Sequence, residues 1–273
     1  MKNKKLLAFG WYGGKFSHLK WLLPLLPQGR HYCEPFAGSA SVLLNRDPSP
    51  IETYNDIDGE VVNFFRVLRE QTEDLISIIR LTPYSREEFT NSIRGDRTTI
   101  SSVERARRFY IRVRQSRLAL AQTATPGRWN FCVNKNISVP RWKGGIEGLE
   151  KVADRILKVQ IENRPSIEVI KRYDSPDTVF YCDPPYLHET RRSPKAYGFE
   201  MTDQDHEELS AVLLGAKGKV ALSGYRCPKM DAWYKEWRRL DPPAKHSSAS
   251  HSMRQESLWM NYDEEKSSRV LFS

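Results

Sequence analysis

The sequence has few cysteines and no long apolar run, and each shortage excludes a class of protein. The four cysteines are scattered through 273 residues without C-x-x-C spacing, at Cys33, Cys132, Cys182 and Cys227. This pattern predicts neither a disulfide framework nor a zinc site, so we expect no metal. No stretch approaches the roughly 18 apolar residues of a membrane span, and the amino-terminal apolar stretch is too short for a signal peptide. We therefore expect a cytoplasmic protein without membrane contact.

The chain also has fewer acidic than basic residues. It contains 34 Asp and Glu against 43 Lys and Arg, which gives a formal net charge of +9 and a pI of about 9.3. A positive surplus attracts polyanions, so nucleic acid is a candidate partner. Because many soluble proteins are mildly basic for other reasons, the charge alone does not establish this partner.

Short apolar runs recur along the chain and predict the buried strands of a sheet. The expected strands are residues 30–34, 52–55, 159–162, 178–182 and 219–223, with further strand material at 256–262 and 269–272. Helical patterns separate several of them, at residues 41–45, 60–71, 166–173 and 203–214. Strands that alternate with helices imply right-handed crossovers and a mostly parallel α/β sheet covered on both faces.

The alternation is interrupted between about residues 72 and 150. This stretch is helical and rich in arginine at first, and then loop-like through residues 123–145. We interpret it as an insertion, which divides the chain into a main domain of residues 1–71 and 151–273 and a basic inserted domain of residues 72–150.

The first expected strand runs into a turn of small residues, Glu34-Pro35-Phe36-Ala37-Gly38-Ser39-Ala40-Ser41. Such a turn lets a ligand approach the backbone and aims the following helix amino terminus at it. Asp56 ends the next strand, 18 positions after Gly38, where a carboxylate can bind a ribose diol. Alternatively, the turn is purely structural and the aspartate caps the following helix. Together the two features favour an adenosine-containing cofactor, without distinguishing NAD from S-adenosylmethionine.

Two further segments carry candidate site residues. Trp11-Tyr12-Gly13-Gly14-Lys15 suits a loop that closes over a ligand, although an ordinary turn with a solvated lysine would have the same composition. The strand at 178–182 ends in Asp183-Pro184-Pro185-Tyr186. Its prolines make a rigid loop that presents the Asp183 carboxylate and the Pro184 carbonyl as neighbouring acceptors. Two such acceptors suit an exocyclic amine on a flipped base that attacks a methyl sulfonium, with Tyr186 stacking on the base.

With these motifs in this order, the sequence resembles the Dam-type (D12 class) adenine-N6 DNA methyltransferases. The matching segments are WYGGK, EPFAGSASVLLN, TYNDID, a variable insertion, VFYCDPPY and VALSGY. The resemblance implies a class I S-adenosylmethionine-dependent methyltransferase with a Rossmann-like, mostly parallel seven-stranded sheet, one antiparallel strand and a helical target-recognition insertion. It implies that the cofactor is bound by Trp11, Tyr12, Lys15, Phe36, Gly38, Asp56, Ile57 and Asp183. Asp183, Pro184, Pro185 and Tyr186 would then form the catalytic loop.

One position departs from the family. Ala40 stands where relatives often have a second glycine in the first motif. Alanine tolerates a positive φ poorly, so the sequence leaves open whether Ala40 weakens cofactor binding.

The insertion carries the candidate contacts to double-stranded DNA. Ala106, Phe109, Tyr110 and Val113 form an apolar stripe on a predicted helix, and Arg105, Arg108 and Arg112 are expected on its opposite face. Glu104 is the only acid near them in sequence, which favours phosphate contacts over local ion pairs. The full set of predicted DNA contacts is Arg105, Arg108, Arg112, Arg114, Arg117, Arg128 and Asn130. The last two lie in a loop suited to base recognition, which does not resemble the recognition segment of GATC-methylating relatives.

Other functions remain open at this point. An RNA base methyltransferase shares the same amine chemistry, an N4-cytosine DNA enzyme more often has Ser in place of Asp183, and a catalytically silent DNA-binding protein could keep the fold. An NAD enzyme would need a hydride-transfer acid or base that the motifs do not supply. Tyr197 and Phe199 could line a base pocket or belong to the core. We expect a monomer or a weak dimer.

Overall fold

The computed structural model describes residues 5–94, 99–117, 121–133, 137–190, 198–242 and 256–263. Within these ranges, seven strands form one sheet in the order β3-β2-β1-β4-β5-β7-β6. The strands are β1 His31–Glu34, β2 Ile51–Asn55, β3 Val159–Glu162, β4 Thr178–Cys182, β5 Lys219–Tyr225, β6 Arg238–Leu240 and β7 Glu256–Met260. Neighbours pair in parallel except at β7, which is antiparallel to both β5 and β6. This is the predicted fold class, including its single antiparallel strand.

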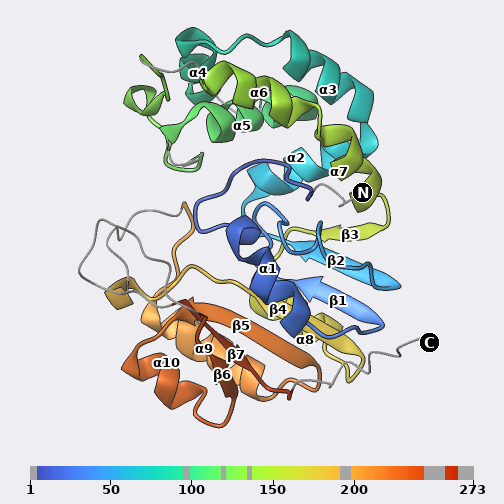
Figure 1. Ribbon diagram of the computed structural model, residues 1–273, viewed down its shortest axis with the longest axis vertical. Coiled ribbons are helices and arrows are strands. Elements are labelled where there is room, and N and C mark those ends of the chain that lie inside the picture. Colours follow the sequence, from blue (N-terminus) through green and yellow to red (C-terminus); the bar gives the residue numbers. More distant parts are fainter. Residues whose placement is uncertain are drawn as a thin grey trace, which may run out of the picture.

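Helices cover both faces of the sheet (Figure 1). Those of the main part of the chain are η1 Lys15–His18, α1 Leu19–Leu22, η2 Leu23–Leu25, α2 Gly59–Glu70, α8 Ser166–Tyr173, η5 His188–Thr190, α9 Asp203–Leu214 and α10 Pro228–Trp233. Side chains alternate along β4: Val179 and Tyr181 join the core that contains α1 and α2, whereas Phe180 and Cys182 join the core beneath α8, α9 and α10. Every residue of β4 is buried, as expected for a central parallel strand.

The inserted segment is helical. Its helices are α3 Thr72–Leu81, α4 Arg86–Ile93, α5 Ser102–Gln115, η4 Pro126–Arg128, α6 Ser138–Ile146 and α7 Leu149–Ile156. Figure 1 shows α3, α4, α5 and α6 grouped at one end of the molecule, beyond the β3 edge of the sheet. An aromatic cluster joins this group to α2, since Phe64 stacks on Tyr110 with ring centroids 5.6 Å apart and Phe9 contacts both Phe64 and Phe109. Because one core spans this junction, the domain boundaries at 72 and 150 stay predictions.

Several sequence predictions about individual elements were wrong. Residues 41–45 form turns rather than a helix, because Asn45 bonds back to the Ser41 carbonyl and two prolines follow at Pro48 and Pro50. The predicted loop 123–145 contains α6, which includes Pro140 only in its first turn. The short, partly exposed strand β6 gave no apolar signal and was missed. The predicted strand at 269–272 lies outside the described residues.

No helix among the described residues is long and apolar enough to span a membrane.

Ala40 adopts the left-handed backbone conformation, which the sequence analysis noted as unfavourable for alanine. Its φ is +55°, and it is the only non-glycine residue with a positive φ in the described part of the chain. Its side chain is fully buried, so the strain is held in place by the surrounding core. The turn after β1 thus adopts at residue 40 a backbone that glycine would adopt without cost.

Replacing Ala40 by glycine is therefore expected to stabilise the protein by about 0.5 kcal/mol. The left-handed conformation costs an L-residue about 1–2 kcal/mol, and the greater freedom of glycine in the unfolded chain offsets part of that gain. The matched control is Ala153→Gly in α7, also buried but at negative φ, which should lower the free energy of unfolding by roughly 1 kcal/mol. Chemical denaturation measures both changes, and an Ala40→Gly protein less stable than the parent would contradict the strain.

Candidate active site and nucleic-acid interface

A cavity of about 740 Å³ lies where β1, β2 and β4 end. Its lining contains all eight residues predicted to bind the cofactor: Trp11, Tyr12, Lys15, Phe36, Gly38, Asp56, Ile57 and Asp183. They come from four separate segments, three of which follow the carboxyl ends of the parallel strands β1, β2 and β4 and therefore meet at one edge of the sheet. The cavity volume is typical of a small-molecule site.

The turn after β1 is held against Asp56 and Trp11. The Gly38 amide donates to Asp56 Oδ2 at 2.8 Å, and the Asp58 amide donates to Asp56 Oδ1 at 2.8 Å. Gly38 has a φ of +49°, and a Cβ added there would lie 2.7 Å from Trp11 Nε1. Burial raises the pKa of Asp56 to about 6, against the lowering effect of these amides. The turn therefore requires glycine at 38 and fixes the carboxylate beside the backbone.

Asp183 lies at the other side of the cavity, with both carboxylate oxygens engaged. Lys15 Nζ is 2.7 Å from Asp183 Oδ2, and the Tyr186 hydroxyl is 3.2 Å from Asp183 Oδ1. Glu256, the first residue of β7, contacts the same two groups: its Oε1 is 2.9 Å from the Tyr186 hydroxyl and 3.3 Å from Lys15 Nζ. Burial raises the pKa of Asp183 to about 6, although Lys15 opposes the shift.

Two predicted roles differ from this geometry. Lys15, predicted to contact the cofactor, has its ammonium buried beside the Asp183 and Glu256 carboxylates, although Lys15 also lines the cavity. The Tyr186 ring is 7% exposed, and Tyr186 and Pro184 face a separate small pocket instead of the main cavity. Stacking of Tyr186 on a base is therefore not available in this conformation. Phe199, which lines the cavity and is 46% exposed, is placed for such a contact. Tyr197 lies outside the described residues.

The sequence analysis missed two residues of the site. Glu256 was missed because it lies far from the other motifs in the chain and has no glycine or proline next to it that would mark a functional turn. Gln122 lines the cavity, donates from Nε2 to Asp58 Oδ2 at 2.8 Å, and accepts from the Gly198 amide at 2.8 Å. It thereby connects the insertion with the segments that follow β2 and the catalytic loop.

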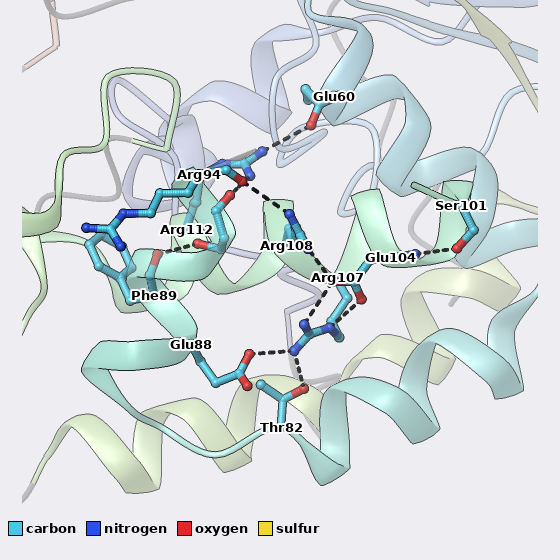
Figure 2. Close-up of polar contacts among 11 residues, drawn as sticks. Glu60, Thr82, Glu88, Phe89, Arg94, Ser101, Glu104, Arg107, Arg108 and Arg112 are labelled. Atoms are coloured by element: carbon cyan, nitrogen blue, oxygen red, sulfur yellow. Dashed lines mark hydrogen bonds and ion pairs between the residues drawn. The ribbon is translucent and has the colours of Figure 1, made fainter. Parts of the chain in front are cut away.

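Several arginines of α5 are paired with glutamates, some from other helices and one from α5 itself (Figure 2). Arg105 and Arg112 both contact Glu60 of α2, with Nη2–oxygen distances of 2.6 and 3.1 Å. Arg112 is 2% exposed, so its prediction as a residue free for solvent or phosphate is wrong. Arg108 pairs with Glu104 at 2.7 Å. The sequence analysis favoured phosphate contacts over local ion pairs, but Arg108 does form a local pair with Glu104, and folding supplies Glu60 from about 50 residues upstream.

The other predicted DNA contacts lie beyond this network. Arg114 donates to the Arg141 carbonyl, and Arg117 is exposed, with its guanidinium 5.2 Å from the centre of the Phe131 ring. Arg128 is half-buried in η4, and the Asn130 backbone is held by the Gln115 carbonyl and the Tyr84 hydroxyl. Arg86 stacks over Trp129 beside them, at 4.7 Å. Arg117 thus belongs to an exposed basic and aromatic surface.

The described residues contain no group of three or more His, Cys, Asp or Glu side chains arranged to hold a metal ion.

Comparison with known proteins places this site in a family. The model of the D12 class N6 adenine-specific DNA methyltransferases matches residues 11–248, which include every site segment before β7. The chain belongs to this family. Its predicted resemblance is therefore confirmed, and its cavity lies among the motifs that carry that resemblance.

Three relatives illustrate the range of this D12-class family. The chain is 23% identical over 252 residues to the DNA N-6-adenine-methyltransferase of Escherichia phage P1, covering 89% of the chain but 33% of the phage protein. It is 27% identical over 254 residues to the Type II methyltransferase M1.LlaDCHI of Lactococcus lactis subsp. cremoris, covering 83% of the chain and 84% of the relative. It is 29% identical over 214 residues to the DNA adenine methylase of Vibrio cholerae, covering 74% of each. The chain thus spans a third of the phage P1 protein and most of the other two.

Replacement by methionine should have different effects at the buried Arg112 and at the exposed Arg117. Arg112→Met should lower the free energy of unfolding by about 3 kcal/mol, because it leaves the Glu60 carboxylate, whose side chain is only 13% exposed, with one partner fewer. Arg117→Met should change stability by less than about 0.5 kcal/mol but weaken binding to duplex DNA, with the slope of log K against log salt reduced by about 1. Denaturation curves and fluorescence anisotropy at several salt concentrations measure these effects. An Arg112→Met protein as stable as the parent would contradict the structural assignment.

Proposed function

We propose that this chain transfers a methyl group from S-adenosylmethionine to the N6 amine of adenine in double-stranded DNA. The observation that carries the proposal is the shared cavity: Gly38 and Asp56, which suit an adenosine-containing cofactor, line the same space as Asp183 of the Asp-Pro-Pro-Tyr loop. Membership of the D12 class supports adenine as the target base.

The residues around the turn fit the cofactor. Asp56 offers carboxylate oxygens to a ribose diol, Ile57 is 45% exposed beside it, and the Gly38 backbone has no Cβ to keep a ligand away. Trp11 and Phe36 provide apolar walls of the same cavity. When bound, the cofactor supplies an electrophilic methyl group. Everything else in the reaction is positioning and electrostatics by this chain.

The Asp183 carboxylate, which lines the cavity, would accept a hydrogen bond from the amine. The amine lone pair is delocalised into the adenine ring, and an acceptor for its hydrogen favours the tetrahedral nitrogen that can attack. The base has to leave the duplex to reach Asp183, and the cavity has room for a cofactor and a flipped base. Phe199 would stack on that base, and Arg117 and Arg128 would contact the DNA outside the cavity.

The direct test is a methylation assay with nucleoside analysis. The protein is incubated with methyl-labelled S-adenosylmethionine and, separately, bacterial genomic DNA free of adenine methylation and structured RNA. We expect N6-methyldeoxyadenosine from DNA and a loss of at least about 100-fold with Asp183→Ala, since the substitution removes an acceptor needed in the transition state. Lys20→Ala, an exposed change on α1, is the matched control.

The remaining outcomes would contradict this assignment in distinct ways. Label in RNA alone would move the function to RNA modification with the same amine chemistry. Cofactor and DNA binding without label in either nucleic acid would favour the catalytically silent DNA-binding protein.

The pKa of Asp183 also predicts the pH dependence. The carboxylate accepts the amine hydrogens only when ionised, and its pKa is raised to about 6. The specificity constant kcat/KM should therefore be constant well above about pH 6 and fall tenfold for each pH unit below it. Lys15 lowers this pKa, so Lys15→Gln should move the acidic limb to higher pH, whereas Lys20→Gln should leave it in place. A limb near pH 4 in the unmodified protein would contradict the buried carboxylate.

A further inference from the structure

A chain of polar groups leads from the catalytic carboxylate toward the protein surface. From Asp183 Oδ1 it runs 3.2 Å to the Tyr186 hydroxyl and 2.9 Å on to Glu256 Oε1. From Glu256 Oε2 it continues 3.4 Å to His18 Nε2. Side-chain exposure is 15% at Glu256 and 21% at His18, which follows the site loop in η1. The family motifs used to recognise the site include neither Glu256 nor His18.

The reaction releases a proton where solvent has poor access. An amine that gains a methyl group forms a nitrogen–carbon bond, while the methyl–sulfur bond breaks and its electron pair stays on sulfur. The nitrogen then sheds one of its two hydrogens as a proton. The Asp183 carboxylate, which faces the cavity, is the nearest acceptor, and a bound base covers that side of it.

We propose that Glu256 and His18 conduct this proton from Asp183 to solvent through the Tyr186 hydroxyl. This inference rests on the proposed function. Asp183 takes the proton from the amine and passes it to the Tyr186 oxygen, while the Tyr186 hydroxyl hydrogen moves to Glu256. Glu256 transfers it to His18, and His18 releases it to water, so every group returns to its starting state. Glu256 and His18 are positioning residues, since neither touches the substrate.

The charges around Glu256 favour onward transfer. The titratable groups that face it are Lys15 and His18 from η1, Tyr181 of β4, Asp183 and Tyr186 of the catalytic loop, and Tyr225 of β5, its register partner. Burial by itself would raise the pKa of Glu256, but Lys15, His18 and Tyr186 together lower it. The pKa of Asp183 is raised, so Glu256 passes a proton on rather than retaining it. Lys15 keeps both carboxylates in place during the transfer.

The test uses two variants of the partly exposed His18 and a small proton carrier. His18→Ala removes the last carrier and leaves space beside Glu256, whereas His18→Gln fills that space with a side chain that does not titrate. Both are assayed on adenine-unmethylated genomic DNA with increasing imidazole at constant pH and ionic strength. We expect kcat to fall about tenfold in both, with KM for DNA and cofactor little changed. Imidazole should restore kcat in His18→Ala alone.

A merely structural role for His18 would give a different pattern. Unchanged kcat in both variants, or a loss in His18→Ala that imidazole does not restore, would overturn the relay. Equal acceleration of the parent protein by imidazole would overturn it as well. Thermal melting of each variant separates a folding defect from a loss of proton transfer, and Glu256→Gln should show reduced kcat that imidazole does not restore. If the parent protein forms no N6-methyladenine, the proposed function fails; if it does and the variants match it, the relay alone fails.

Discussion

The side-by-side pairing of β1 with β4 is the constraint on which the site depends. The two strands are parallel, with Cys33 opposite Phe180, although 147 residues separate them in the chain. Because parallel strands end at the same edge, the turn that begins at Pro35 and the loop that begins at Asp183 open into one cavity. The full burial of both strands fixes this register, since a one-residue slip would turn every side chain to the other face.

Two networks of buried and partly buried charge serve different ends. Around Asp183, one ammonium is shared by two carboxylates, an arrangement that keeps the charge of the site low in a region where ions are poorly solvated. Around Glu60, one carboxylate is shared by Arg105 and Arg112, which ties the inserted helix α5 to the first turn of α2. Such a network contributes specificity of packing more than net stability, because each buried ion loses its hydration. It holds the insertion in a defined position relative to Asp56 and Asp58.

The insertion is joined to the cavity as well as to the core. Gln122 bonds to Asp58 on one side and to Gly198 on the other, so the segment expected to approach DNA is in contact with the segment expected to hold the cofactor. The absence of a side chain at residue 198 is what allows this, because a Cβ there would lie 2.7 Å from the Gln122 Cβ. Arg86 and Arg117 of the same insertion are exposed and lie over the rings of Trp129 and Phe131, where they can meet a polyanion.

The sequence by itself determined the strands, the order of the motifs and the family, because buried strands, glycine turns and an Asp-Pro-Pro-Tyr loop depend on residues that are neighbours in the chain. It also identified Ala40 as a strained position, since the conformational limits of alanine are local. Only the tertiary structure decided which groups pair with Lys15, Arg105 and Arg112. It also decided the burial of the Tyr186 ring and the places of Glu256 and Gln122 in the site. Ion pairing and burial depend on which distant segments folding brings together, and a charge pattern read along one helix contains no information about the helix that packs against it.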